Sequence, residues 1–322
     1  MGDDRGISTV VDVALALFFI TASIAVIGVY MADQGGGQVN SQTDSRTAET
    51  LSSTTQTVHY SLWDVRSDPN FNPNNTDRSQ DGVTYERSSH GTTASLLADS
   101  AMMNVQFSQS FTNGSKHGVI HSAGPSFYKA VDSGLRNTIT GMNKNTQIIV
   151  VWEPYEEAGM SSRQKYGPSP SPDEDISSTT MTVDSGVPPV DEGELERDYR
   201  TDDDFEAVSD RIAARIVEGY FPVGPSQSAI EDQGLTRELT VYRYQRFGSF
   251  VGVDYNPGAI IAAGPLTRRG ADASEANRDL ERGLSNQIRG DLNSTSSYED
   301  ISANELSDRV STGNVKIIVR TW

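Results

Sequence analysis

The chain has 322 residues and is strongly acidic, with 44 Asp and Glu residues against 26 Lys and Arg residues and a formal net charge of -18. A nucleic-acid partner is therefore not expected, because phosphate binding requires a basic surface. Cysteine is absent, which excludes disulfides, thiolate metal sites and cysteine nucleophiles. A composition rich in Asp and poor in Lys indicates a halophilic protein, since molar salt shortens the Debye length to about 3 Å and screens repulsion. The alternative is an acidic surface that only confers solubility.

An apolar segment near the N-terminus contains no charged residue from Val13 to Met31. At about 1.5 Å per residue, a helix over this segment is about 28 Å long, close to the thickness of a bilayer core. We predict a single transmembrane helix over residues 7–32, with a buried helix of a soluble protein as the alternative. Arg5 precedes the segment and Asp33 follows it, so the positive-inside rule predicts a cytoplasmic N-terminus and an extracellular remainder.

Arg5 and Gly6 stand directly before the sequence ISTVVD, and this pattern resembles the class III signal of archaeal type IV pilins. In that family a prepilin peptidase cuts after the glycine, and the whole hydrophobic helix stays on the mature protein. The resemblance therefore implies cleavage between Gly6 and Ile7. Type IV pilins usually carry an acidic fifth residue, whereas Asp12 is the sixth residue counted from Ile7. A cleaved secretory signal is the alternative, but residues 29–33 match its small-residue pattern poorly.

Asp12 is the candidate assembly residue, because it lies inside the apolar segment near its cytoplasmic edge. A carboxylate at the centre of a membrane helix costs about 2.5–3.5 kcal/mol, and less near an interface, so such a residue usually has a partner. We expect the N-terminal amine of Ile7 from a neighbouring subunit; the alternative is a hydrated, unpaired Asp12 at the headgroups. Small residues that let helices approach closely recur along the segment: Ala14, Thr21, Ala25 and Gly28.

The residues beyond the apolar segment predict an extracytoplasmic α+β head. After a flexible exit and stalk at 33–57, the expected elements are a strand at 58–62, a return strand at 83–86, a helix from Thr92 or Thr93 to about Gln106, a helix at 126–139 and a buried strand at 147–152. Residues 159–204 are rich in Pro, Ser and acidic residues, which indicates a linker or long exposed excursion between the head parts 58–158 and 205–322. The second part is expected to contain a helix from Phe205, a strand at 238–247, helices at 273–288 and 303–310, and a final strand at 315–322.

Enzyme signatures are absent from the sequence: it has no G-x-S-x-G elbow, P-loop or G-x-G-x-x-G turn. His117 and His121 have the spacing of two metal ligands on a helix, but the neighbouring glycines favour ordinary surface or partly packed histidines. We therefore expect no catalytic residue, metal site or cofactor. Three sequons provide candidate N-glycosylation sites at Asn74, Asn113 and Asn293.

Four further segments carry a second resemblance: 90–99, 215–222, 241–244 and 319–322. Together with the N-terminal helix they resemble an uncharacterised family of haloarchaeal membrane-anchored, type IV pilin-like proteins found near pilus or secretion ATPases. This implies a non-enzymatic pilin-like subunit or accessory component of a surface filament or secretion apparatus, with the membrane and other pilin-like subunits as partners. The alternatives are a bitopic surface binding protein that remains in the lipid and a membrane-tethered extracellular enzyme.

Overall fold

The computed structural model describes residues 41–68, 71, 85–108, 111, 118–139, 145–201, 205–232, 234–255, 266 and 270–322. The predicted transmembrane segment lies outside these residues, together with every residue assigned above to processing or assembly: Arg5, Gly6, Ile7, Asp12, Ala14, Thr21, Ala25 and Gly28. No helix within the described ranges is both long enough and apolar enough to cross a bilayer. The membrane helix at 7–32 therefore stays a prediction.

The described chain has an α+β fold built on a six-stranded antiparallel sheet with the strand order β4-β3-β6-β5-β8-β7. Its strands are β3 (Gln106–Phe107), β4 (Gly118–Val119), β5 (Thr146–Trp152), β6 (Met160–Tyr166), β7 (Ser177–Asp184) and β8 (Asn314–Thr321). β5 is buried at almost every position, as its continuous apolar run predicts, whereas β8 alternates between buried and open positions. The predicted strands at 147–152 and 315–322 are thus confirmed, and they pair with each other.

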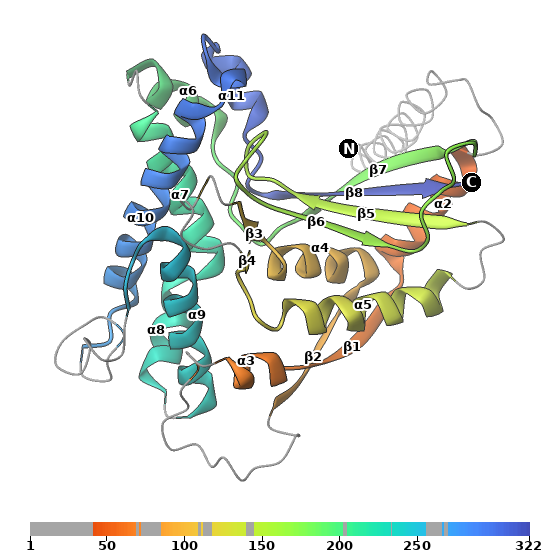
Figure 1. Cartoon of the computed structure of the whole chain (residues 1–322), viewed down its shortest axis with the longest axis horizontal. Helices are drawn as coiled ribbons and strands as arrows, with labels where there is room; N and C mark the ends of the chain where they lie inside the picture. The colour runs from red at the N-terminus through yellow and green to blue at the C-terminus, as the bar shows by residue number, and fades with distance from the viewer. Residues whose placement is uncertain are drawn as a thin grey trace, which may run out of the picture.

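Three helices pack below the sheet in Figure 1: α2 (Ser41–Ser53), α4 (Thr93–Met103) and α5 (Gly124–Ile139). α4 contacts the four strands β5 to β8, and α2 contacts β7 and β8. Thr92 caps α4 by accepting a hydrogen bond from the Ser95 backbone N–H, which confirms the predicted helix start. α5 packs on an antiparallel ribbon of β1 (Thr55–Ser61) and β2 (Glu86–Thr92), which are separated in the chain by α3 (Trp63–Ser67).

A group of helices stands beside one end of the sheet, on the left in Figure 1. It comprises α6 (Glu192–Thr201), α7 (Glu206–Tyr220), α8 (Val223–Glu231), α9 (Leu235–Val251), α10 (Ala273–Ser294) and α11 (Ala303–Arg309). α10 buries Leu280, Leu284 and Ile288, whose spacing of four residues places them on one face of the helix. Tyr155 follows β5 in the chain. Its hydroxyl donates a hydrogen bond to the Asp291 carboxylate of α10 at 2.8 Å. This contact joins the helices to the sheet.

The predicted strand at 238–247 is wrong, because these residues belong to the helix α9. Tyr244, Phe247 and Val251 are buried and recur at spacings of three and four, which places them on one helical face. The tyrosines and valine of this segment suit strands in isolation, but packing against α8 and α10 selects the helix. Gly252 then ends α9 in the left-handed conformation, with a φ of 77°.

The predicted linker at 159–204 is also wrong, because it supplies β6, β7 and α6. Both strands are rich in polar residues because only part of each strand faces the core, so their composition resembles that of a loop. Hydrogen bonding to β5 and β8 determines their conformation. The division into head parts 58–158 and 205–322 fails for the same reason: β5 pairs with β8, and a single hydrophobic cluster extends from Leu51 to Val319.

Candidate binding cavity

A cavity of about 260 Å³ lies where the β1–β2 ribbon, α4, the C-terminal end of α7 and the middle of α9 meet. Its wall is mostly apolar, with side chains that include Met102, Met103, Ile120, Phe127, Val187 and Phe221. A few polar side chains also face it: Tyr60, Asp99, His121, Tyr220 and Arg243. An apolar hollow with a small number of polar groups is the usual form of a small-molecule site.

Arg243 supplies the positive charge of the cavity from the middle of α9. Its Nη2 donates a hydrogen bond to the Tyr220 carbonyl oxygen at 2.9 Å, and its guanidinium carbon lies 5.4 Å from the centroid of the Phe221 ring. Burial lowers the pKa of this guanidinium, which nevertheless stays protonated at any physiological pH. Among the described residues no carboxylate lies within 4.0 Å of it. Within the described ranges, the contacts of this charge are therefore the carbonyl dipole of Tyr220 and the ring of Phe221.

His121 lines the cavity as a neutral imidazole. Its Nδ1 accepts a hydrogen bond from the Ala123 backbone N–H at 3.2 Å, so the ring proton is on Nε2. Burial, together with the positive charges of Arg243 and Arg246, lowers the pKa of His121 to about 3. A histidine with this pKa is a poor general base at neutral pH. It also contributes no second positive charge to the cavity.

Asp99 and Tyr60 form a second polar region of the wall. Burial raises the pKa of Asp99, although its side chain is open to the cavity. Burial also raises the pKa of Tyr60, which Arg87 and Arg243 lower and Asp99 raises further. The charges of both Asp99 and Arg243 thus influence the pKa of the Tyr60 phenol, while these two charged groups do not form an ion pair with each other.

The C-terminal end of α7 forms another side of the cavity. The Tyr220 hydroxyl donates a hydrogen bond to the Met102 carbonyl oxygen at 2.9 Å, which ties α7 to α4. Gly219 permits a close approach to the loop after β7, because a Cβ at this position would lie 2.7 Å from the Cα of Val187. A residue larger than glycine would therefore push the two walls apart.

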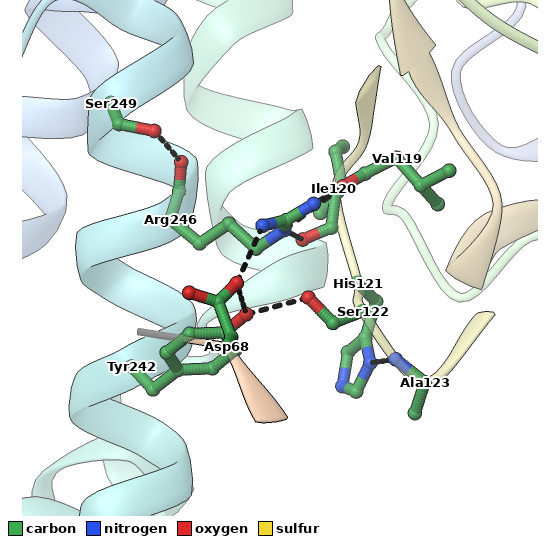
Figure 2. A network of polar contacts seen from close by, with 9 residues as sticks. All are labelled: Asp68, Val119, Ile120, His121, Ser122, Ala123, Tyr242, Arg246 and Ser249. Carbon is green, nitrogen blue, oxygen red and sulfur yellow. Dashed lines mark hydrogen bonds and ion pairs between the residues drawn. The ribbon is translucent and has the colours of Figure 1, made fainter. Parts of the chain in front are cut away.

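A network next to the cavity holds the segment that carries Ile120 and His121 (Figure 2). The Arg246 guanidinium donates hydrogen bonds to the carbonyl oxygens of Val119 and Ile120 at 2.8–3.1 Å and binds the Asp68 carboxylate. The Tyr242 hydroxyl donates to the same carboxylate at 2.6 Å, and burial raises its pKa to about 12. These bonds fix one wall of the cavity to α9, one helical turn from Arg243.

The structure places few of the sequence-predicted site residues. His117, Asn74 and Asn113 lie outside the described residues, whereas His121 faces the cavity. Within the described ranges no group of three or more His, Asp and Glu side chains could hold a metal ion. Asn293 is exposed near the end of α10, where its Nδ2 donates to the Arg289 carbonyl oxygen at 2.9 Å. It stays a candidate for glycosylation.

Sequence reasoning missed Arg243 because it assigned this residue to a strand. In a helix, an arginine between Tyr242 and Tyr244, next to buried aromatic positions, is a signal that a charge lies beside the core. Three of the four segments that carry the second resemblance contribute to the cavity, through Asp99, Tyr220 and Arg243. The fourth segment lies in β8 and its end.

The fold and the cavity define an α+β protein with a partly open, largely apolar hollow lined by Arg243. A family described as a family of unknown function, DUF7284, matches residues 11–322, and the chain belongs to this family. No curated protein and no solved structure matches the chain.

Proposed function

We propose that this protein is a non-enzymatic, pilin-like subunit or accessory component of an archaeal type IV pilus-like filament or secretion apparatus. Its apolar segment at 7–32 spans the cell membrane or packs in the filament, and its acidic α+β head lies outside the cell. The observation that carries the proposal is the attachment of α2 to the sheet, because α2 connects the apolar segment to the head.

α2 buries one side against the head. Asp44, Thr47 and Leu51 are each at most 1 % exposed, and their spacing of three and four residues places them on one helical face. The Asp44 carboxylate accepts hydrogen bonds from the hydroxyls of Ser177 in β7 and Thr321 in β8. From Asp44 onward the chain that follows the apolar segment is thus held against the head, so α2 is packed and does not form part of the flexible stalk expected at 33–57.

A bitopic membrane protein that binds a ligand at the cell surface is the second candidate, and the cavity favours it. The neutral His121 supports binding rather than acid–base catalysis there, as does Arg243, which forms no ion pair with any residue that the structure describes. A filament subunit with a ligand-binding head would combine both candidates, so the decisive question is whether the protein enters filaments.

The test is Asp12→Asn in the native cell, with the variant Asp33→Asn outside the apolar segment as the matched control. Membrane insertion should persist in both variants, whereas the amount of Asp12→Asn protein in sheared surface filaments or purified complexes should fall at least tenfold. Normal incorporation of the Asp12→Asn protein into filaments would contradict the proposed pairing of Asp12 with the amine of Ile7. If the unmodified protein is found only in the membrane and in no assembly, the bitopic candidate replaces the pilin proposal.

A further inference from the structure

We propose that the cavity around Arg243 binds a small organic monocarboxylate, whose carboxylate pairs with the guanidinium and whose apolar body contacts the surrounding side chains. This inference does not depend on the proposed role in assembly, because every residue that carries it belongs to the head. It assigns a ligand class to a hollow that the assembly role leaves unexplained.

The first argument is the state of Arg243. A guanidinium that is largely withdrawn from solvent needs a counter-charge, and in the described part of the chain its contacts are the Tyr220 carbonyl and the Phe221 ring. That hydrogen bond leaves most of the planar fork of N–H donors available, and a carboxylate fits the fork with two parallel hydrogen bonds. Asp99 does not fill this role, although it lines the same cavity.

The second argument concerns the charge of the ligand. His121 is neutral at physiological pH, and the nearby Arg246 is already engaged by Asp68 and two carbonyl oxygens. Arg243 is thus the one cation that lines the cavity among the described residues. A single positive charge balances a monoanion, whereas a phosphate with two negative charges would remain half uncompensated in an apolar hollow. Asp99 further disfavours a ligand with a second carboxylate.

The third argument is the size and lining of the cavity. Its volume of about 260 Å³ lies just below the range of about 300–1,000 Å³ that is typical of ligand pockets, so the occupant is a small molecule. Met103, Ile120 and Phe127 provide an apolar surface for a short alkyl chain or one ring. Phenylacetate has both parts, a carboxylate and a ring, and serves as the probe.

The experiment measures binding to the full-length protein in detergent micelles by ligand-observed NMR and calorimetry, with empty micelles as the blank. The probes are phenylacetate, its uncharged analogue phenylacetamide, and inorganic phosphate. We expect saturable binding of phenylacetate, with phenylacetamide and phosphate at least tenfold weaker. Equal affinity for the acid and the amide, tighter binding of phosphate, or no binding of phenylacetate would overturn the proposal.

Two variants and one control locate the binding. Arg243→Gln should weaken phenylacetate binding at least tenfold, while Arg282→Gln, which removes an exposed arginine of α10, should leave it unchanged. Arg243→Gln also removes the bond to Tyr220, so a second variant keeps Arg243 intact. Ser89→Trp places an indole into the cavity from β2 and should abolish binding while circular dichroism shows an intact fold, because aromatic residues are generally compatible with strands. Retained binding in a folded Ser89→Trp protein would contradict the assignment.

Discussion

The guanidinium of Arg246 binds the carboxylate of Asp68 with an Nη1–Oδ2 distance of 3.2 Å, although the two residues are 178 positions apart in the chain. The side chains are only 24 % and 13 % exposed, so the pair is largely withdrawn from water. Figure 2 shows that the same arginine also reaches the backbone of Val119 and Ile120. One side chain of α9 thereby holds both the end of α3 and the segment before α5.

We expect Arg246→Gln to destabilise the head by about 2–4 kcal/mol, because it removes the partly buried ion pair with Asp68 and the guanidinium donors to two carbonyl oxygens. Chemical denaturation of the full-length protein in detergent measures the loss. Arg200→Gln is the control, since Arg200 forms an exposed pair with Glu196 and should change the stability by less than about 0.5 kcal/mol. Equal losses in the two variants would show that the Arg246 contacts contribute little.

The low pKa of His121 predicts a pH dependence of stability. The unfolded histidine has a pKa of about 6.5, whereas in the folded protein the pKa is about 3. Between these values the unfolded state binds a proton that the folded state does not bind, so the stabilising contribution is complete above pH 6.5 and is lost as the pH falls towards 3. The slope attributable to this residue is at most about 1.4 kcal/mol per pH unit.

His121→Asn retains an acceptor for the Ala123 N–H and removes the titration. Stability measured from pH 7 to pH 4 should therefore decrease more steeply in the unmodified protein than in this variant. Asp99, whose pKa is raised, acts in the opposite direction and is common to both proteins, so it cancels in the difference. Parallel curves would mean that the folded protein takes up the proton on His121 as readily as the unfolded chain.

Asp44 should be essential for the attachment of α2. Asp44→Ala removes the acceptor of two hydroxyls at a position that is 1 % exposed, so we expect a loss of about 2–4 kcal/mol. Glu49→Ala is the matched control, because Glu49 is exposed on the same helix. Limited proteolysis should cut within 41–53 of Asp44→Ala protein and spare the control. Equal protection of both variants would show that the remaining contacts of α2 are sufficient.

The net charge of -18 predicts a salt-dependent stability. The Debye length increases from about 3 Å at 1 M salt to about 10 Å at 0.1 M, so dilution strengthens the repulsion within the acidic head. Thermal unfolding of the full-length protein should shift to lower temperature on dilution, by similar amounts in KCl and NaCl at equal ionic strength. A melting temperature that does not change between 0.1 M and 1 M would contradict the expected adaptation to high salt.

Cleavage after Gly6 is the prediction that concerns the N-terminus. Mass spectrometry of the protein from its native membrane should find a mature chain that begins at Ile7, because Arg5 and Gly6 precede an uninterrupted apolar segment. Arg5→Ala or Gly6→Leu should leave the leader in place. A native N-terminus at Met1 or Gly2, or one beyond Ala32, would show that the prepilin resemblance does not extend to processing.

Local sequence signals were sufficient to predict an element where its cap and its apolar pattern lie within the element itself. The cap at Thr92 and the apolar spacing after it predicted α4, and the continuous apolar run at 147–152 predicted the central strand. The helix expected at 273–288 is α10, which extends to Ser294. In each case the pattern lies within one element, so it can be recognised without knowing which other elements pack against it.

Tertiary structure alone decided the remaining elements and the cavity. β6 and β7 are strands because β5 and β8 offer hydrogen bonds to them, and α9 is a helix because its buried face packs on neighbouring helices. The cavity brings together Tyr60, Asp99, His121, Tyr220 and Arg243 from five separate segments of the chain. The sequence by itself determined the acidic charge, the apolar N-terminal segment and the elements with strong internal periodicity. It could not determine which distant segments meet, because the burial of Arg243, away from any carboxylate in the described part of the chain, arises only when those segments pack together.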